Sequence, residues 1–451
     1  MKKILYSSVS IALLANIANA FDYNVGGTAQ TFTKVGFNNQ SYNSSTGAAP
    51  TESFTTIFAQ LNLNADLGSG FRFGLGGSIG GLAFDSTRNN IIAGQEFSAV
   101  QTSYYGYAYD KNTMQNYMIQ NAFLEYLYND RIYFRLGRYE SGTAGANHNQ
   151  KVGEYFSGYT QGAEGYIRLG ITRIWGFWSN RRGFAYDEFF NDFYRVHGVD
   201  KNGNGRQTYA AGIDFNTTKF TASLFSYGVT GKVVAPGISL TYDTNPDFAF
   251  RGLRSITKIR TIVPMALGLE GEFWGESASV RQNQWRGIEK TTATLYIEQK
   301  FDLSKFNFGA GYYQNFGNAN AHIGTWGNPL LSTIDIWTAS AYDIGQALSD
   351  IVGKDAITGY GFVGGDYNVF HWKIIARGTK SERSDEQSVG LSLNYRIRDD
   401  LFIGGKIEWF SDTTKAGYSP IAGYAGENAG VLSKNRTDDR SHAFFYIHHH
   451  F

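Results

Sequence analysis

Two short motifs contain residue types that perform catalysis or bind metal ions in other proteins. The segment GGSIG at residues 76–80 matches a nucleophile elbow, but that motif needs a strand-to-helix turn and here lies in a glycine-rich alternating stretch. The segment DKNGNG at residues 200–205 resembles the start of a calcium loop, but its twelfth position is Ala211, where the loop requires Glu. We therefore expect a strand at the first segment and turn chemistry at the second.

Three consecutive histidines near the end of the sequence form another candidate metal site. If they lie in a strand, His448 and His450 point to the face opposite His449, so the three cannot converge on one ion. No nucleophile–base set stands out elsewhere, and the chain contains no Cys. The sequence therefore predicts no enzymatic activity, no metal site and no cofactor.

Charged residues at alternating positions favour transport instead. Cations alternate with apolar neighbours in extended segments, and a Lys or Arg that faces lipid at mid-bilayer costs about 2–4 kcal/mol. We expect the following residues to line a pore: Arg131, Arg135, Arg138, Arg168, Lys373, Arg377, Arg396 and Lys406. A row of cations would steer anionic groups such as carboxylates. The alternative is that they only pair with nearby acids, for which the candidates are Glu125, Glu164, Glu298 and Glu408.

The segments that carry these residues alternate between apolar and polar side chains. In residues 57–67 every odd position is apolar, and every even position after Phe58 is polar. The same period of two recurs in residues 292–301, 388–397 and 401–409. A period of two is typical of β-strands with one apolar face. The pattern predicts an all-β protein.

Short turns and longer connections alternate along the chain. Eight short turns are predicted, at residues 68–70, 129–130, 169–170, 216–218, 244–247, 302–304, 366–368 and 398–400. Much longer connections lie between several of them, such as residues 85–115, 182–205 and 411–439. A soluble sandwich has mostly short connections at both ends. Short periplasmic turns and long external loops are typical of an outer-membrane β-barrel.

The turns also predict the number of strands. With both termini in the periplasm, eight periplasmic turns correspond to eighteen antiparallel strands, with one long external connection at residues 317–355. An extra strand pair around residues 334–340 would give twenty strands, and sixteen is a further alternative. Lipid offers no hydrogen-bond partner to an open sheet edge, so the strands must close into a barrel. A barrel of eighteen strands holds an aqueous channel.

The beginning of the sequence resembles a secretory signal peptide. Lys2 and Lys3 precede an apolar stretch at residues 4–17, and an A-x-A cleavage site follows at residues 18–20. We expect residues 1–20 to be removed and residues 21–451 to form a single transmembrane barrel in the bacterial outer membrane, in contact with lipid and lipopolysaccharide. The 16% aromatic content suits strands and interfacial girdles, and a formal net charge of +1 gives no reason to expect nucleic-acid binding.

Two segments carry a resemblance to a known family. Residues 122–140, AFLEYLYNDRIYFRLGRYE, resemble the strand–turn–strand segment of OprD-type specific porins and related epsilonproteobacterial channels. Residues 155–163, YFSGYTQGA, are similar to the end of their constriction loop. The aromatic-rich pattern of the whole chain, with Phe451 last on an alternating strand, resembles the Hof family of Helicobacter outer-membrane proteins and a barrel-assembly signal. The resemblance implies an eighteen-strand porin for small charged solutes such as amino acids.

The third external connection, at residues 140–160, is the predicted constriction. In porins the third loop folds inward and narrows the pore, which would bring Glu140, His148, Lys151 and Glu154 to the solute. An ordinary solvated loop is the alternative. The sequence thus predicts a porin for passive diffusion of small hydrophilic solutes, including those that bear a carboxylate. A surface adhesin that uses loops such as residues 102–117 is the second hypothesis, and a homo-oligomer is left open.

Overall fold

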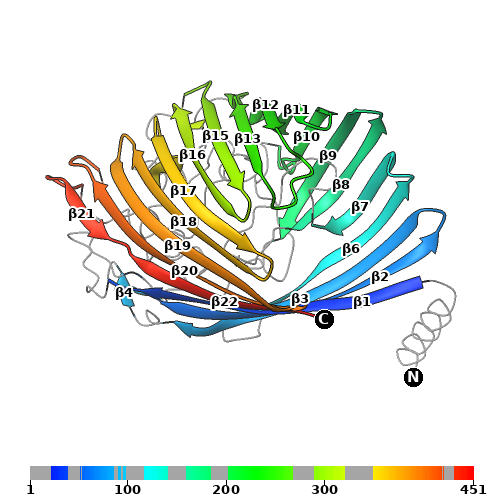
Figure 1. Cartoon of the computed structure of the whole chain (residues 1–451), viewed down its shortest axis with the longest axis horizontal. Helices are drawn as coiled ribbons and strands as arrows, with labels where there is room; N and C mark the ends of the chain where they lie inside the picture. Colours follow the sequence, from blue (N-terminus) through cyan, green and yellow to red (C-terminus); the bar gives the residue numbers. More distant parts are fainter. Residues whose placement is uncertain are drawn as a thin grey trace.

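The strands of the chain form one closed antiparallel β-barrel. The computed structural model describes all residues except 1–21, 39–50, 52, 86–89, 93–94, 98–115, 141–158, 184–201, 268–288, 320–348, 419 and 421–430. The barrel strands are β1 (Asp22–Gly36), β2 (Phe54–Gly68), β3 (Phe71–Asp85), β6 (Asn116–Tyr128), β7 (Ile132–Tyr139), β8 (Tyr159–Leu169), β9 (Thr172–Gly183), β10 (Thr208–Asn216), β11 (Phe220–Val229), β12 (Val233–Asp243), β13 (Leu253–Ile262), β15 (Ala293–Leu303), β16 (Phe306–Phe316), β17 (Ile357–Tyr367), β18 (Phe370–Lys380), β19 (Ser384–Arg398), β20 (Leu401–Thr414) and β22 (His442–His450). Figure 1 shows them side by side around the lumen.

The first and last strands close the barrel. β1 pairs with β2 on one side and with β22 on the other, from Thr28↔His450 to Gly36↔His442. β16 pairs directly with β17, from Phe306↔Gly365 onward, so the long connection between them adds no strand to the wall. The prediction of eighteen strands is confirmed, and residues 334–340 lie outside the described part of the chain.

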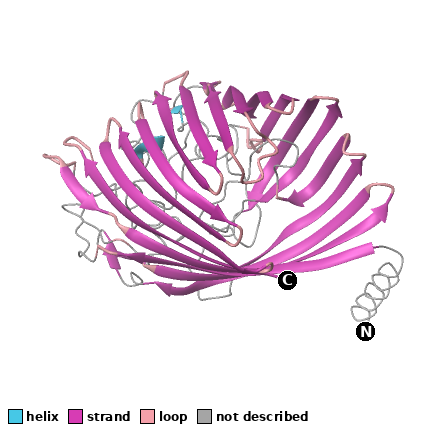
Figure 2. Cartoon of the chain, in the orientation of Figure 1, coloured by secondary structure: helices cyan, strands magenta, loops and turns pink. Residues whose placement is uncertain are grey.

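Four further short strands are not counted among the eighteen strands of the barrel wall. β14 (Met265–Ala266) continues the pairing with β12 beyond the end of β13, and β21 (Arg436–Asp439) pairs with the end of β20. β4 (Asn90–Ile92) and β5 (Gln95–Phe97) form a separate hairpin. Among the described residues, no helix is long and apolar enough to cross a membrane. Figure 2 shows how strongly strands dominate the described chain.

All eight predicted short turns connect neighbouring strands at one end of the barrel. Left-handed backbone conformations explain their composition: Asn129 and Asp130 have φ of 48° and 52°, and Asn368 has φ of 58°. Asn, Asp and Gly adopt this conformation more easily than other residues, so they favour tight hairpins that match strand twist. We call this the short-turn end and the opposite end the long-connection end.

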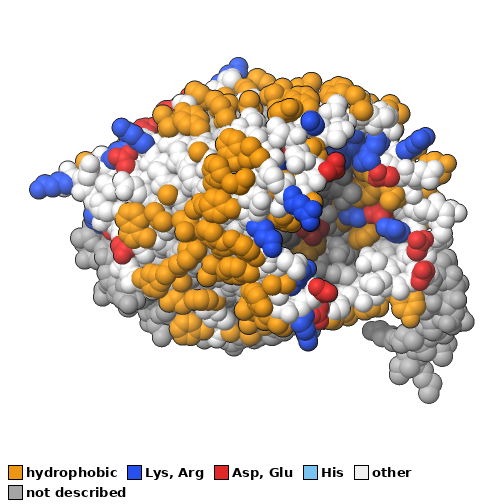
Figure 3. Space-filling model, in the orientation of Figure 1, with side chains coloured by type: hydrophobic (Ala, Val, Ile, Leu, Met, Phe, Trp, Pro, Cys, Tyr) orange, Lys and Arg blue, Asp and Glu red, His pale blue; other side chains and the backbone are white. Residues whose placement is uncertain are grey.

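Alternation separates an apolar outer face from a polar inner one. Leu136, Ile407 and Phe445 are 48%, 51% and 57% exposed on the outside, whereas neighbours such as Tyr133, Glu408 and Phe444 are buried on the inside. Figure 3 shows the apolar side chains covering the outer surface, and charged side chains around a hollow at the right of the view. This distribution suits a barrel with lipid outside and water inside.

Candidate pore-lining site

One group of lumen residues lies on β6, β7 and β8, and we call it the Arg135 cluster: Phe123, Glu125, Tyr133, Arg135, Tyr139 and Glu164. Arg135 Nε donates to Glu125 Oε2 at 2.9 Å, and the guanidinium lies 4.6 Å from the centre of the Phe123 ring. The Tyr133 hydroxyl donates to Glu164 Oε1 at 3.0 Å. The Arg135 side chain remains 17% exposed, so it is held in place while part of it still faces the lumen.

The two described ends of the third external connection contact the lumen wall. Arg135 Nη1 donates to the Glu140 carbonyl at 3.5 Å, where the connection leaves β7. Where it rejoins β8, the Tyr159 hydroxyl donates to Gln60 Oε1 of β2 at 3.2 Å. β2 is four strands away from β8 around the wall, and Gln60 pairs with Ser78, which is buried on the inner face. The hydrogen bond therefore spans the lumen side of the three strands between them, β3, β6 and β7.

Of the four side chains predicted at the constriction, the structure describes only that of Glu140. Glu140 is exposed at the end of β7. His148, Lys151 and Glu154 lie outside the described residues. Of residues 102–117, on which the adhesin hypothesis rests, 102–115 also lie outside them, and 116–117 begin β6. Their roles remain predictions.

Ion pairs line the lumen nearer the short-turn end. Arg173 Nε donates to Asp214 Oδ2 at 2.8 Å, and Lys258 Nζ lies 3.0 Å from Glu298 Oε1. Further pairs include Arg72–Glu125, Arg168–Asp130, Arg254–Asp243, Lys300–Asp302 and Arg396–Asp399. These basic residues are each matched by a carboxylate, which favours pairing over a ladder of uncompensated charge.

Three of the four glutamates predicted as partners form such ion pairs. Glu125 pairs with Arg135, Glu298 with Lys258, and Glu408 with Lys406, whose Nζ lies 2.6 Å from Glu408 Oε2. The fourth, Glu164, accepts the hydrogen bond from Tyr133.

Three predicted cations have distinct positions. Arg131 is exposed in the turn after β6, and Lys373 lies with its Nζ 5.1 Å from the centre of the Phe362 ring. Arg138 lies on the outer face of the barrel, although it was expected in the pore. It is two residues after the outward-facing Leu136, and its Nε donates to Gln161 Oε1 at 3.0 Å.

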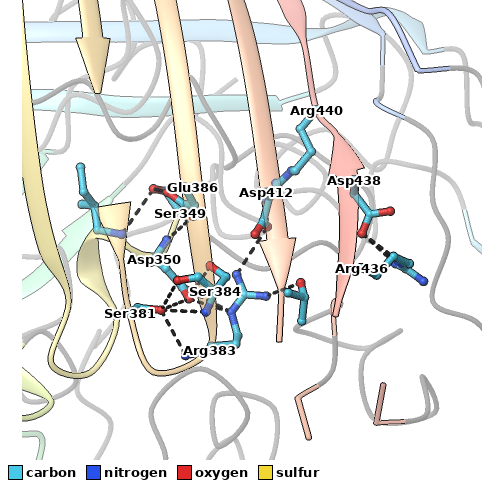
Figure 4. Close-up of polar contacts among 12 residues, drawn as sticks. Ser349, Asp350, Ser381, Arg383, Ser384, Glu386, Asp412, Arg436, Asp438 and Arg440 are labelled. Carbon is cyan, nitrogen blue, oxygen red and sulfur yellow. Dashed lines mark hydrogen bonds and ion pairs between the residues drawn. The ribbon is translucent and has the colours of Figure 1, made fainter. Parts of the chain in front are cut away.

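A second group of lumen residues lies on and against β18–β20, near the long-connection end, and we call it the Asp350 cluster. Asp350 belongs to the short 3-10 helix η5 (Asp350–Val352), between β16 and β17. The other members are Ser349, Arg377, Ser381, Arg383, Ser384, Glu386, Asp412 and Arg440, most of which Figure 4 shows. All nine are buried, and they come from segments up to 91 residues apart in the sequence (349 to 440).

Dense hydrogen bonding fixes η5 to the wall. The Asp350 carboxylate accepts bonds from Arg383 Nε at 2.9 Å and from Ser384 Oγ at 2.8 Å (Figure 4). Glu386 Oε1 accepts from the Asp350 amide at 2.6 Å, and Glu386 Oε2 accepts from Arg377 Nη1 at 3.2 Å. Burial alone would lower the pKa of Arg383, but the adjacent Asp350 and Asp412 carboxylates hold that pKa above its usual value.

Sequence reasoning identified Arg377 but missed most of this cluster. Asp350 lies in a long connection, where alternation gives no signal, and Arg383 lies in the segment between β18 and β19. Only the proximity of the connection to the wall brings their charges together.

Comparison with known proteins gives a family and a fold. The model of the family described as "Putative outer membrane protein" (HP_OMP_2) matches residues 8–451. No curated protein matches the chain. Among solved structures, the chain is similar to OccK9 (OpdG) of Pseudomonas aeruginosa, with 11% identity, a TM-score of 0.65 and coverage of 95% of this chain and 98% of that one. It is also similar to OccAB3 of Acinetobacter baumannii, with 10% identity, a TM-score of 0.63 and coverage of 95% and 99%.

Proposed function

The chain belongs to the HP_OMP_2 family of outer membrane proteins, and from this premise we propose that it is a porin for passive diffusion of small hydrophilic solutes. Solutes enter at the long-connection end, pass the third connection and leave at the short-turn end. A closed barrel of this size has room for an aqueous channel. The polar inner face allows water and ions to occupy it.

The observation that carries the proposal is the way the third connection meets the lumen. Tyr159 reaches across to Gln60, and the Glu140 carbonyl accepts from Arg135. Both ends of the connection therefore turn inward. We propose that this connection narrows the pore, with Glu140, His148, Lys151 and Glu154 facing the solute. Selectivity depends on charge where a pore is narrow, so the partly exposed Arg135 would contact carboxylate-bearing solutes there.

The paired lumen charges refine this selectivity. Arg135 is compensated by Glu125, and Arg173 by Asp214, so the wall offers positive and negative charges next to each other. Solutes with both a carboxylate and an ammonium group fit such a wall better than simple anions do. This supports small charged solutes, as the resemblance to OprD-type porins implies.

Reconstitution into planar bilayers tests the proposal. Pure, folded protein should insert and give stepwise conductance, whereas the same protein kept unfolded in urea should not. The absence of steps from protein shown to be folded by its heat-dependent mobility in gels would contradict a pore. Reversal potentials in a salt gradient would then give the ion selectivity.

Other parts of the proposal concern assembly and partners. Phe451 completes the pairing of β22 with β1, because its amide donates to the Gly27 carbonyl at 3.0 Å and its carbonyl accepts from the Gly27 amide at 2.7 Å. Its ring is exposed on the outside, where the barrel-assembly machinery would reach it.

We also propose that residues 1–20 are cleaved on export and that the protein has no enzymatic activity or cofactor. Membership of the Hof family and homo-oligomer formation stay predictions.

A further inference from the structure

A polar cleft lies on the barrel at the long-connection end of β8, β9 and β10. Its volume is about 270 Å³, and its lining residues are Gln161, Asn180, Arg181, Gly205 and Gln207. None of these residues is acidic. The cleft does not belong to the Arg135 cluster or to the Asp350 cluster.

Strand alternation shows that this cleft faces outward. Arg138 shares the outer face with Leu136, and residues paired across neighbouring strands point to the same side. Arg138 pairs with Gln161, and Gln161 pairs with Arg181. A β-bulge or similar irregularity interrupts the β8–β9 register next to this pair, and Asn180 of β9 has no partner in that register. The Gln161 side-chain amide donates to Asn180 Oδ1 at 3.4 Å. Two guanidinium groups and several amides thus gather on the lipid side of the wall.

The level of the cleft along the barrel corresponds to the membrane surface. The exposed apolar residues Leu136 and Ile174 lie further toward the short-turn end on the same face. Trp178 and Tyr209, which are 37% and 39% exposed, border the cleft, and Trp178 Nε1 donates to Gln207 Oε1 at 2.7 Å. Aromatic residues of this kind mark the interfacial girdle of outer-membrane barrels. Because long connections are external, the cleft lies level with the headgroups of the outer leaflet.

The chemistry of the lining indicates its ligand. Guanidinium groups bind phosphate with paired hydrogen bonds and tolerate partial burial. Side-chain amides donate to and accept from sugar hydroxyls. We propose that this cleft binds the phosphorylated sugar headgroup of an outer-leaflet glycolipid of the lipopolysaccharide type. Arg181 in the lining, and Arg138 beside it on Gln161, would bind phosphate, and Gln161, Asn180 and Gln207 would bind sugar. The inference rests on the outer-membrane location of the chain and is independent of the pore.

Native mass spectrometry of the full chain in detergent tests the site. The wild type is titrated with bisphosphorylated lipid A, with dephosphorylated lipid A and with inorganic phosphate. Arg181→Gln removes a charge-assisted contact to phosphate. The variant should therefore bind bisphosphorylated lipid A about tenfold more weakly than wild type does. Arg138→Gln should weaken it in the same direction, and Arg181→Lys should recover part of the loss. Dephosphorylated lipid A should bind wild type and variants equally weakly.

Lys380→Gln provides the matched control. Lys380 is exposed at the long-connection end of β18 and pairs with the outward-facing Ile357. The substitution therefore removes one cation from the outer face, away from the cleft. Its binding should equal that of wild type. The proposal is overturned if Arg181→Gln binds like wild type, if Lys380→Gln loses as much, or if inorganic phosphate binds as tightly as lipid A. Bilayer conductance is recorded separately, so failure of the pore and failure of this site are distinguishable.

Discussion

The lumen wall carries two arginine–carboxylate clusters that differ in what covers them. In the Arg135 cluster the arginine side chain is 17% exposed and its partner Glu125 is 6% exposed. In the Asp350 cluster the corresponding values are 2% for Arg383 and 0% for Asp350. Both use the same residue types on the same face of the barrel. The second is sealed because η5 carries Asp350 and Ser349 onto β18 and β19.

This difference assigns the clusters different tasks. A buried charge that loses its partner is strongly destabilising, so a sealed cluster holds its segments in one arrangement. A partly exposed charge in a narrow passage interacts with whatever passes. We infer that the Asp350 cluster anchors the connection between β16 and β17, and that the Arg135 cluster faces the solute. The following experiments test this contrast, from the largest expected effect to the smallest.

Asp350→Asn should have the largest effect on stability. It leaves the buried Arg383 with a weaker set of anions: Asp412, whose Oδ2 lies 3.6 Å from Arg383 Nη2, and Glu386. Loss of one partner from a buried pair costs about 3–5 kcal/mol in the free energy of unfolding. Urea unfolding in detergent measures the loss, and protease cleavage between β16 and β17 should become faster. Asp130→Asn, in the exposed pair with Arg168, is the control and should cost less than about 1 kcal/mol. Equal losses would contradict the contrast.

Arg135→Gln should change selectivity more than stability. It leaves the Glu125 and Glu164 carboxylates beside a remaining cation, Arg72, whose Nη1 lies 3.7 Å from Glu125 Oε1. The local charge becomes more negative, so the pore should favour cations. One unit charge at about 4 Å in water contributes about 1 kcal/mol, so the anion-to-cation permeability ratio should fall roughly fivefold. Reversal potentials in a salt gradient measure the ratio.

Arg440→Gln is the matched control for Arg135→Gln. Arg440 is fully buried, with its Nη1 3.4 Å from Asp412 Oδ2, so no solute reaches it. The variant should lose stability but keep the reversal potential of wild type. A larger change of selectivity in Arg440→Gln than in Arg135→Gln would contradict the assignment, because it would place the solute beside the Asp350 cluster.

Tyr159→Phe should loosen the third connection without removing a charge. The substitution deletes the hydrogen bond to Gln60, which contributes about 1 kcal/mol. Single-channel recordings should show more open-state noise and unchanged selectivity. Tyr128→Phe removes a hydroxyl from an outward-facing side chain and should leave the recordings unchanged. Identical noise in both variants would count against a third connection held in place by this hydrogen bond.

The smallest effect should come from a rim pair outside both clusters. Burial tends to raise the pKa of Glu289, but the Asn318 amide and Lys354 outweigh it and leave this pKa below its usual value. A depressed carboxyl pKa stabilises the fold above the unfolded pKa, and this stability disappears as pH falls through the folded pKa. Wild type should lose a little stability below about pH 4.5 that Glu289→Gln does not lose. Urea unfolding at several pH values measures the step, and an equal acid response in both proteins would contradict it.

The barrel could be predicted from the sequence because its signals are local. Alternation over a few residues determines which side chains face lipid, and turn residues such as Asn129 and Asp130 mark where strands reverse. Eight such turns gave the number of strands, and the need to satisfy backbone hydrogen bonds in lipid required closure. The inner positions of Arg135 and Lys406 follow from the same period of two. Counted from Arg135, that period also places Arg138 on the outer face, which the pore-lining prediction overlooked.

Only the tertiary structure decided how the connections meet the wall. The bond between Tyr159 and Gln60 joins residues 99 positions apart, and η5 meets Arg383 only because the barrel curves around it. Connections have no hydrophobic period, so their packing depends on which charges the closed wall brings within reach. The sequence determined a wall that is apolar outside and polar inside. The folded chain determined which of its arginines are sealed and which remain open to the lumen.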